Sequence, residues 1–305
     1  MKYLKIFYNI LKQTINEFSD DRVMKLSASL TYYALFSLSP LILIIISGIS
    51  LFLAKDTVEI KVFSELSSIL GKEVSRALQD FVTNSMVSGD STVALWIGVG
   101  VLIFGATTMF ADMQDSLNTI WRIEATPHKA WLKFIVNRCI SLLIILSVGL
   151  LLMTTVILNS ILVNFGEEIF EFLKIDEFVT QATVILINNT LTAFLSIMVF
   201  FILFKVLPDA NVKFKPALVG SIFTATLFFI SKYLIGIYIA NTKYSKVFGS
   251  AGSLVILLLW IYYISTILFL GAKFTKVYAE HIKLPIKPKK NAKQKEVKLI
   301  NNTEK

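Results

Sequence analysis

One stretch of this sequence, residues 26–54, holds no charged side chain between Lys25 and Lys55. An α-helix rises about 1.5 Å per residue, so these residues extend roughly 43 Å as a helix. This length exceeds the ~30 Å hydrocarbon core of a bilayer, and a helix in a soluble core rarely needs it. We therefore predict that the stretch forms a first membrane-spanning helix.

The first half of this stretch is unusually polar for a membrane helix. Ser29, Tyr33 and Ser37 recur at steps of four residues, so they share one helical face. Because lipid offers no hydrogen-bond partners, this face is expected to meet other helices, where it either lines a path or only packs. Pro40 removes one hydrogen bond of the helix and frees the carbonyl of Phe36, which we expect a neighbouring hydroxyl such as that of Ser37 or Ser39 to satisfy.

Similar uncharged runs recur along the chain, which is 55% hydrophobic. Each contains about 20 residues or more, the length of a membrane-spanning helix. They cover residues 91–111, 139–166, 178–204, 216–240 and 247–272, and Lys232 splits the fifth predicted span. The sequence therefore predicts an all-α, polytopic membrane protein with six transmembrane helices.

Two other segments read as amphipathic helices at the membrane interface. Residues 1–20 place apolar side chains at helical spacing with lysines between them, which predicts a helix on the membrane surface or against the bundle, unless it is a frayed terminus. Residues 56–84 are too polar to span and predict one or two helices broken near Gly71. We divide the chain into an amphipathic helix (1–20), a six-span membrane domain (21–282) and a lysine-rich cytoplasmic tail (283–305).

The distribution of positive charge predicts the orientation. The net charge is +9, and residues 281–305 alone hold eight lysines against two glutamates. Beside membrane helices, such a tail indicates topology and anionic lipid headgroups as partners rather than nucleic acid. Lys and Arg also concentrate before the first span and after the second and fourth, which predicts that both termini lie in the cytoplasm. The first 20 residues lack the apolar core of a signal peptide.

Several polar side chains fall inside or beside the predicted spans, where placing a polar group costs free energy and indicates a structural or functional role. Lys232 follows Thr224 by eight residues on one face of the fifth span, and it is either a cation on a substrate path or a structural, snorkelling lysine. Asn188 and Thr192 share a face of the fourth span and either bond to other helices or line a cavity. After the second span, Asp112, Asp115 and Arg122 form a stripe that is expected to pair with other segments or to serve a function.

No enzyme constellation emerges from the residue types. The chain has one cysteine and two histidines far apart in sequence, so a Cys/His zinc set is not available. We find no Walker loop, GxSxG or HExxH pattern, and Asp112 with Asp115 are too few for a metal nuclease. We expect no catalytic residues, cofactor or metal.

Four segments resemble the YihY/BrkB family of bacterial inner-membrane proteins. They are KLSASLTYYALFSLSPL (25–41), DSLNTIWR (115–122), KVLPDANVKFKPALVGS (205–221) and GSAGSLVILLLWIYYISTILFLGAKFTKVYAE (249–280). The resemblance covers about residues 20–282 and implies a six-span, all-helical fold. Members are discussed as transporters or exporters, including of lipid-linked material, and an old ribonuclease BN label is regarded as a misassignment. The motifs coincide with polar or structural positions at Tyr33, Ser37, Pro40, Asp115, Asn118, Arg122, Pro208, Lys232 and Gly252.

The sequence thus favours a transporter or exporter of an anionic or lipid substrate. Its path would run between the first, fourth and fifth spans, with Lys232 attracting the anionic group. No ATP-binding motif is present, so transport would follow a gradient, be passive or depend on a partner. The alternative is a non-transporting membrane scaffold or envelope-integrity factor that recruits partners through its amphipathic start and lysine tail.

Overall fold

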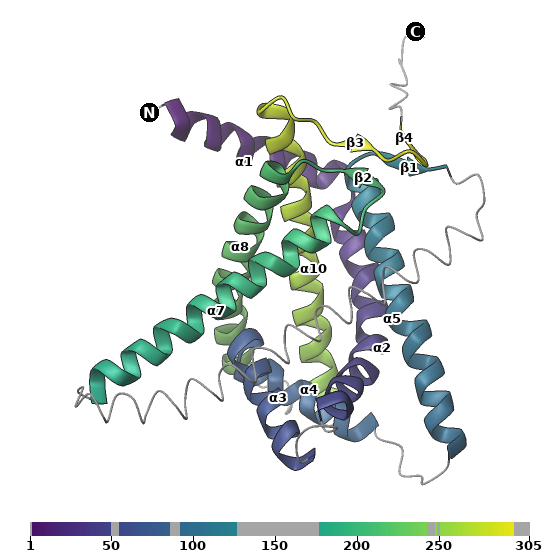
Figure 1. Ribbon diagram of the computed structural model, residues 1–305, viewed down its shortest axis with the longest axis vertical. Coiled ribbons are helices and arrows are strands. Elements are labelled where there is room, and N and C mark those ends of the chain that lie inside the picture. The colour runs from purple at the N-terminus through teal and green to yellow at the C-terminus, as the bar shows by residue number, and fades with distance from the viewer. Residues whose placement is uncertain are drawn as a thin grey trace.

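The computed structural model describes residues 2–49, 55–85, 92–126, 177–242, 248 and 251–295. These residues form a helical bundle with two short sheets at one end (Figure 1). The helices are α1 (Lys2–Asp20), α2 (Val23–Ile49), α3 (Lys55–Leu70), α4 (Lys72–Ser85), α5 (Thr92–Ile120), α7 (Glu177–Lys205), α8 (Phe214–Asn241) and α10 (Gly252–His281). The strands are β1 (Ile123–Ala125), β2 (Ala210–Asn211), β3 (Lys287–Pro288) and β4 (Ala292–Gln294).

The uncharged runs of the sequence coincide with long helices. Five of the six predicted spans overlap α2, α5, α7, α8 and α10 over most of their length, and the third, residues 139–166, lies outside the described residues. Within the described ranges, Phe214–Ile239 of α8 and Gly252–His281 of α10 are long and apolar enough to cross a membrane by length and composition. Helix α7 contributes a shorter apolar segment, Asn189–Lys205.

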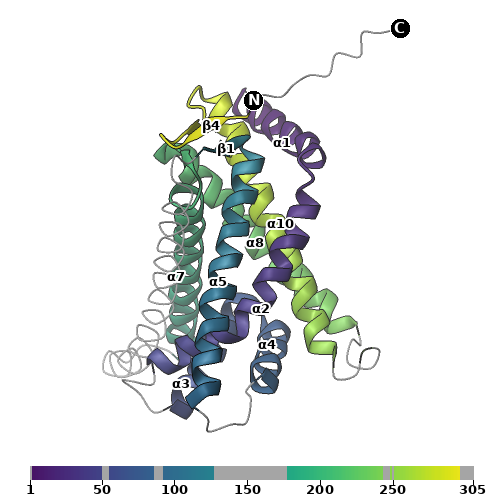
Figure 2. The same cartoon turned by 90° about the vertical axis from the view of Figure 1, so that its right-hand side faces the viewer.

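Helix α10 lies at the centre of the bundle and contacts most of the other described helices. It packs against α1, α2, α4, α5 and α8, while α2 also packs on α5, and α7 on α8 (Figures 1 and 2). Its last third is buried on every side, since all residues from Gly271 to Val277 are buried. The main core forms around this segment and the ends of α5 and α7, with Trp121, Phe204 and Phe269 among its largest fully buried side chains.

Helices α8 and α10 cross closely through a reciprocal pair of glycines and threonines. A Cβ atom on Gly220 would lie 1.9 Å from Oγ1 of Thr275, and one on Gly271 would lie 1.8 Å from Oγ1 of Thr224. Each threonine hydroxyl donates to the glycine carbonyl one turn earlier in its own helix, at 2.7 Å. Because both hydroxyls are satisfied within their helices, the two backbones approach on small residues alone, a common way to pack membrane helices.

The segment after α2 forms two helices broken at Gly71, as predicted, and these fold into a hairpin. Gly71 adopts a φ of +97°, a conformation that glycine tolerates without strain. Phe63 of α3 and Ala77 of α4 are buried. Ser75 on α4 donates a hydrogen bond of 2.9 Å to the carbonyl of Phe63 on α3 and joins the two helices. The hairpin lies at the end of the bundle opposite α1 and the strands (Figure 1).

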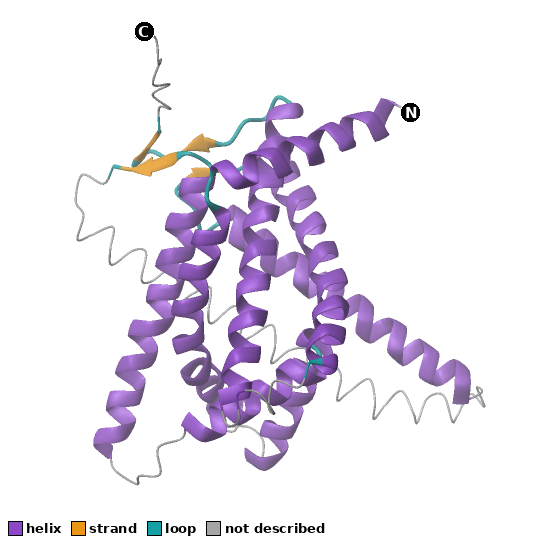
Figure 3. Cartoon of the chain, turned by 180° about the vertical axis from the view of Figure 1, so that it is seen from behind, coloured by secondary structure: helices purple, strands orange, loops and turns teal. Residues whose placement is uncertain are grey.

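The chain after α10 folds back onto the loops between helices. Strand β3 pairs antiparallel with β2, which follows α7, and β4 pairs antiparallel with β1, which follows α5 (Figure 3). Ile286, just before β3, is buried. Residues 286–295, which the sequence assigns to the lysine-rich tail, therefore contribute to the folded end of the bundle.

The α8–α10 crossing can be tested by adding one methyl group. Gly271→Ala should destabilise the protein by about 1–3 kcal/mol, because the new Cβ overlaps Thr224 in a filled interface. Gly236→Ala on α8 is the matched control, since a Cβ atom there meets nothing within 4 Å. The control should leave stability unchanged or raise it by up to about 1 kcal/mol. Thermal unfolding of the purified protein in detergent measures both, and equal midpoints would contradict the close crossing.

Candidate functional site

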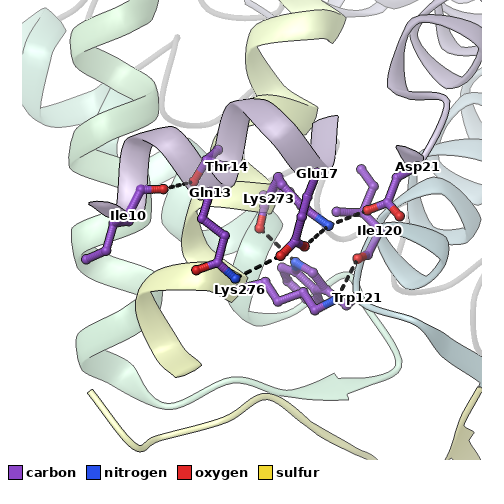
Figure 4. A network of polar contacts seen from close by, with 10 residues as sticks. Ile10, Gln13, Thr14, Glu17, Asp21, Ile120, Trp121, Lys273 and Lys276 are labelled. Atoms are coloured by element: carbon purple, nitrogen blue, oxygen red, sulfur yellow. Dashed lines mark hydrogen bonds and ion pairs between the residues drawn. The ribbon is translucent and has the colours of Figure 1, made fainter. Parts of the chain in front are cut away.

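The most deeply buried charge among the described residues is that of Lys273 on α10, whose side chain is 0% exposed. Its Nζ lies 2.6 Å from Oε2 of Glu17 on α1 and donates to Oδ2 of Asp21 at 2.5 Å (Figure 4). A buried ammonium is tolerated only when it is paired and hydrogen-bonded, and here two carboxylates meet that need. The sequence does not predict this site, because Lys273 directly follows the uncharged run 247–272 and is interpreted only as the residue that ends the span.

Glu17 is held in its charged form by the same cluster. Burial alone would raise its pKa, but hydrogen bonds from Lys273 and Gln13, together with the charges of Lys273 and Lys276, hold the pKa of this carboxyl below its ordinary value. Gln13 Nε2 donates at 2.8 Å. Because the pKa is lowered from 4.5, the contribution of Glu17 to stability is complete at neutral pH and is lost as pH falls through the lowered pKa.

The end of α5 is attached to the same turn of α10. Trp121 Nε1 donates to the carbonyl of Ala272 at 2.9 Å, and Lys276 Nζ lies 3.5 Å from the carbonyl of Ile120 (Figure 4). Ile120 is the last residue of α5, where helix carbonyls lack partners of their own. Lys276 thus provides a positive charge at the negative end of the α5 dipole.

Lys232, the intramembrane lysine of the sequence analysis, has a different environment. It is half-buried on α8, and its Nζ donates to the carbonyl of Ser68 in the last turn of α3. Its Nζ also lies 5.8 Å from the centre of the Tyr233 ring, within the range of a cation–π contact. Among the described residues it forms no ion pair with a carboxylate. The charge is therefore balanced only by the partial charges at a helix end and by an aromatic face.

The polar face of α2 meets α5. Ser29 Oγ donates to Oδ1 of Asp112 at 2.7 Å, and Ser37, which is buried, lies 3.2 Å from the sulfur of Met109. Tyr33, between them, is half-buried and makes an edge contact with Tyr32 at 5.4 Å. The prediction that this face meets another helix is confirmed.

Ser37 is not the hydroxyl that satisfies the carbonyl of Phe36, because it donates to the carbonyl of Ala34 at 2.9 Å. The side chain of Ser39, the other expected donor, lies outside the described residues. A serine hydroxyl in a helix reaches back three or four residues, and Phe36 is the adjacent residue. Helix α2 continues through Pro40, whose side chain lies outside the described residues.

Two buried side-chain atoms of the described residues have no hydrogen-bond partner in the protein, Asp112 Oδ2 and Trp260 Nε1. Asp112 thus accepts one hydrogen bond, from Ser29, through a single oxygen. Because buried polar atoms are nearly always paired, an exception on a carboxylate identifies a candidate functional group.

Asn118 and Asp209 join two of the quoted motifs. Asn118 Nδ2 donates to Oδ2 of Asp209, and the backbone N–H of Asp209 donates to Oδ1 of Asn118, both at 2.9 Å. Pro208 is buried beside this pair, and its carbonyl accepts a hydrogen bond of 2.7 Å from Lys289. The sequence places these residues in separate motifs, and only the tertiary fold shows that they form one contact.

The other predicted positions are dispersed. Arg122, two residues after the end of α5, has a φ of +56°, and its carbonyl accepts a hydrogen bond of 2.8 Å from the N–H of Lys295. Asp115 is exposed, and Gly252 is buried at the start of α10.

The polar side chains that were expected to line one path between the first, fourth and fifth spans lie in different surroundings. Thr224 lies in the α8–α10 crossing, Thr192 on α7 is buried, and the side chain of Asn188 lies outside the described residues. Helix α10 packs against both α2 and α8, and α2 has no extensive contact with α7 or α8. The described residues contain no group of three or more His, Cys, Asp and Glu side chains that could hold a metal.

Comparison with known proteins gives consistent matches along almost the whole chain. Residues 14–296 match the family model described as virulence factor BrkB. A UPF0761 membrane protein of Saccharophagus degradans is 27% identical over 90% of this chain and 60% of its own length. One of Pseudomonas aeruginosa is 28% identical over 84% of this chain and 59% of its own length. One of Photobacterium profundum is 27% identical over 90% of this chain and 84% of its own length.

The chain spans about 60% of the length of the first two of these relatives. No solved structure matches it. The family match reaches from α1 into the strands after α10, and so includes the Lys273 cluster, the Asn118–Asp209 contact and part of the predicted tail. This chain belongs to the YihY/BrkB family and, like its UPF0761 relatives, is a membrane protein.

Proposed function

We propose that this chain is a six-span protein of the bacterial inner membrane that moves an anionic substrate across the bilayer, with an anionic lipid as the favoured substrate. It acts without enzymatic chemistry, cofactor or nucleic-acid partner. The observation that carries the proposal is the contrast between two lysines of the long apolar helices, Lys273 on α10 and Lys232 on α8.

The proposed topology is supported by the directions of the helices. Residues near the ends of α5 and α7 meet through Asn118 and Asp209, so these two helices run toward the same end of the bundle. Thr126 and Glu177 therefore lie toward opposite ends of the bundle, and the predicted third span falls between them in the sequence. Helix α1 and the strands after α10 lie together at that shared end (Figures 1 and 3), which supports both termini on one side. The Lys and Arg excess of these segments favours the cytoplasmic side.

The two lysines differ in how their charge is balanced. Lys273 is fully buried between two carboxylates, which is a structural arrangement. Lys232 forms no ion pair with a carboxylate in the described part of the chain, although it lies within an apolar helix. An uncompensated cation within a membrane span is expensive, and such residues commonly mark substrate pathways.

The surroundings of Lys232 favour a substrate that reaches it from the lipid. Its neighbours on α8, namely Tyr233, Leu234 and Ile237, are 57–65% exposed. An apolar exposed face in a membrane protein contacts acyl chains. A lipid with its tails along this face could therefore bring an anionic headgroup to Lys232 at the junction of α8 and α3.

The scaffold alternative rests on α1, which exposes Tyr8 and Ile15, each 64% exposed, on the half of its apolar face that does not pack on the bundle. Deleting the whole tail, residues 284–305, would not test the scaffold role alone, because the deletion also removes the buried Ile286 and the strands β3 and β4. A shorter deletion, of residues 296–305, leaves all the described elements in place.

Lys232 can be tested in proteoliposomes that contain NBD-labelled phosphatidylglycerol, with dithionite added outside. The wild type should expose the inner-leaflet probe, and Lys232→Met should slow this roughly tenfold or more, because a hydrogen bond to a charged group contributes about 1.5–3 kcal/mol. Lys232→Arg should retain most of the rate, and Lys215→Met, which removes an exposed lysine at the start of α8, is the matched control. Equal rates for the wild type and Lys232→Met would contradict the proposal.

The scaffold alternative is tested in cells. It would be favoured if deletion of residues 296–305 abolished the cellular function while Lys232→Met left that function intact.

Lys273 should behave as a structural residue. Lys273→Met leaves Glu17 and Asp21 without their cation, and we expect a loss of roughly 3–5 kcal/mol of stability. Adding Glu17→Gln and Asp21→Asn should restore much of it, because the unpaired charges are then removed. Thermal unfolding in detergent checks this, and an unchanged midpoint for Lys273→Met would show that the cluster does not hold the bundle together.

The topology can be read with alkaline phosphatase fusions, which are active only outside the cytoplasm. A fusion after Thr242, at the end of α8, should be active, and a fusion at residue 305 should be inactive. An active fusion at residue 305 would overturn the proposed orientation.

A further inference from the structure

We propose that Asp112 is a proton-binding site at the α2–α5 crossing. Its Oδ1 stays hydrogen-bonded to Ser29, and its buried Oδ2 takes up the proton. The ligand is a proton from water, which converts the carboxylate to the neutral acid with no other change in bonding.

The pairing of Asp112 is unlike that of the other acidic groups with interhelical contacts. Glu17 and Asp21 share the ammonium of Lys273, and Asp209 is bonded to the amide of Asn118. Among the described residues, Asp112 is bonded to the hydroxyl of Ser29 alone, at 2.7 Å, and its second oxygen is buried without a partner there. A carboxylate in such a place is costly as an anion and far less so as the neutral acid.

The charged groups on the elements packed around Asp112 do not neutralise it. On α5 itself Asp115 lies one turn further on, and its like charge disfavours a second anion. On α2, Lys25 is exposed one turn before Ser29, and Tyr33 follows one turn after it. On α10, Lys273 is held by its own carboxylates and Lys276 contacts Ile120, two turns beyond Asp112; on β1, Glu124 pairs with Lys293.

The position of the site gives proton binding a mechanical consequence. Asp112 and Ser29 join two helices that also meet through the contact of Ser37 with the Met109 sulfur and through small groups, such as Gly105 against the backbone of Ser37. Ionisation leaves an unpaired negative charge at this contact and weakens the packing of α2 on α5, whereas protonation restores it. Resting on the proposed function, this links substrate movement to a proton gradient, which suits a chain without an ATP-binding motif.

Infrared difference spectroscopy tests the site without any transport assay. The full-length protein in lipid nanodiscs is titrated with pH, and we follow the band of a carboxyl group that is still protonated after the exposed acids have ionised. We expect this band to titrate in the wild type, to disappear in Asp112→Asn and to shift in frequency in Ser29→Ala, which removes the hydrogen bond to Oδ1. Asp115→Asn, an exposed acid one turn away, is the matched control and should keep the band. A titrating band that survives in Asp112→Asn, or no titrating band in the wild type, would overturn the proposal.

The spectroscopic and transport measurements together distinguish a failure of the proton site from a failure of the proposed transport function. If the Asp112 band titrates but labelled phosphatidylglycerol does not move in proteoliposomes, the proton site stands and the lipid-transport function fails. If lipid movement depends on Lys232 but the band is absent, the function stands and the proton site fails.

Discussion

The burial of one positive charge, that of Lys273, organises the terminal end of this bundle. A fully buried ammonium requires anionic partners, and the carboxylates come from Glu17 and Asp21, more than 250 residues earlier in the chain. Because these residues lie at the end of α1 and just before α2, the pairing fixes where both helices meet α10. The same turn of α10 receives the indole N–H of Trp121, so the end of α5 is fixed as well.

Six consecutive residues of α10 divide the contacts with its neighbours. Gly271 and Thr275 face α8, while Ala272 and Lys276 face the end of α5. Lys273 faces the carboxylates, and the ring of Phe274 stacks on Phe223 of α8 at 3.9 Å and meets Phe7 of α1 at 6.3 Å. These six residues, GAKFTK, form about one and a half helical turns and contribute to three interfaces. A substitution on any side of the segment therefore disturbs the packing of one interface.

Local features of the sequence were sufficient to predict the helices. The uncharged runs correspond to α2, α5, α7, α8 and α10, the break at Gly71 follows from a residue that tolerates positive φ, and the Ser29–Ser37 face was correctly expected to meet another helix. The partners were not predictable, because they depend on which helix ends meet in space. Asn118 with Asp209, and Lys273 with Glu17, are separated by 91 residues or more, and no spacing rule connects them. The strands after α10 were missed because their lysine content resembles that of a solvated tail.

The two ends of the bundle differ in how firmly they are held, and this bears on where a transport movement can occur. At the terminal end, ion pairs, the Trp121 hydrogen bond, the Gly–Thr crossing and the two small sheets join α1, α5, α8 and α10. At the opposite end, Lys232 joins α8 to α3 through a single backbone carbonyl. A contact with a helix carbonyl can be exchanged for an anionic headgroup, since both supply oxygen acceptors to the same ammonium. Between the two ends, the polar contacts of α2 with α5 are those of Ser29 with Asp112 and of Ser37 with the sulfur of Met109. The proposed substrate site thus lies at the less firmly held end and the proposed proton site lies along the α2–α5 crossing, while the end around Lys273 remains fixed and keeps the helices in register.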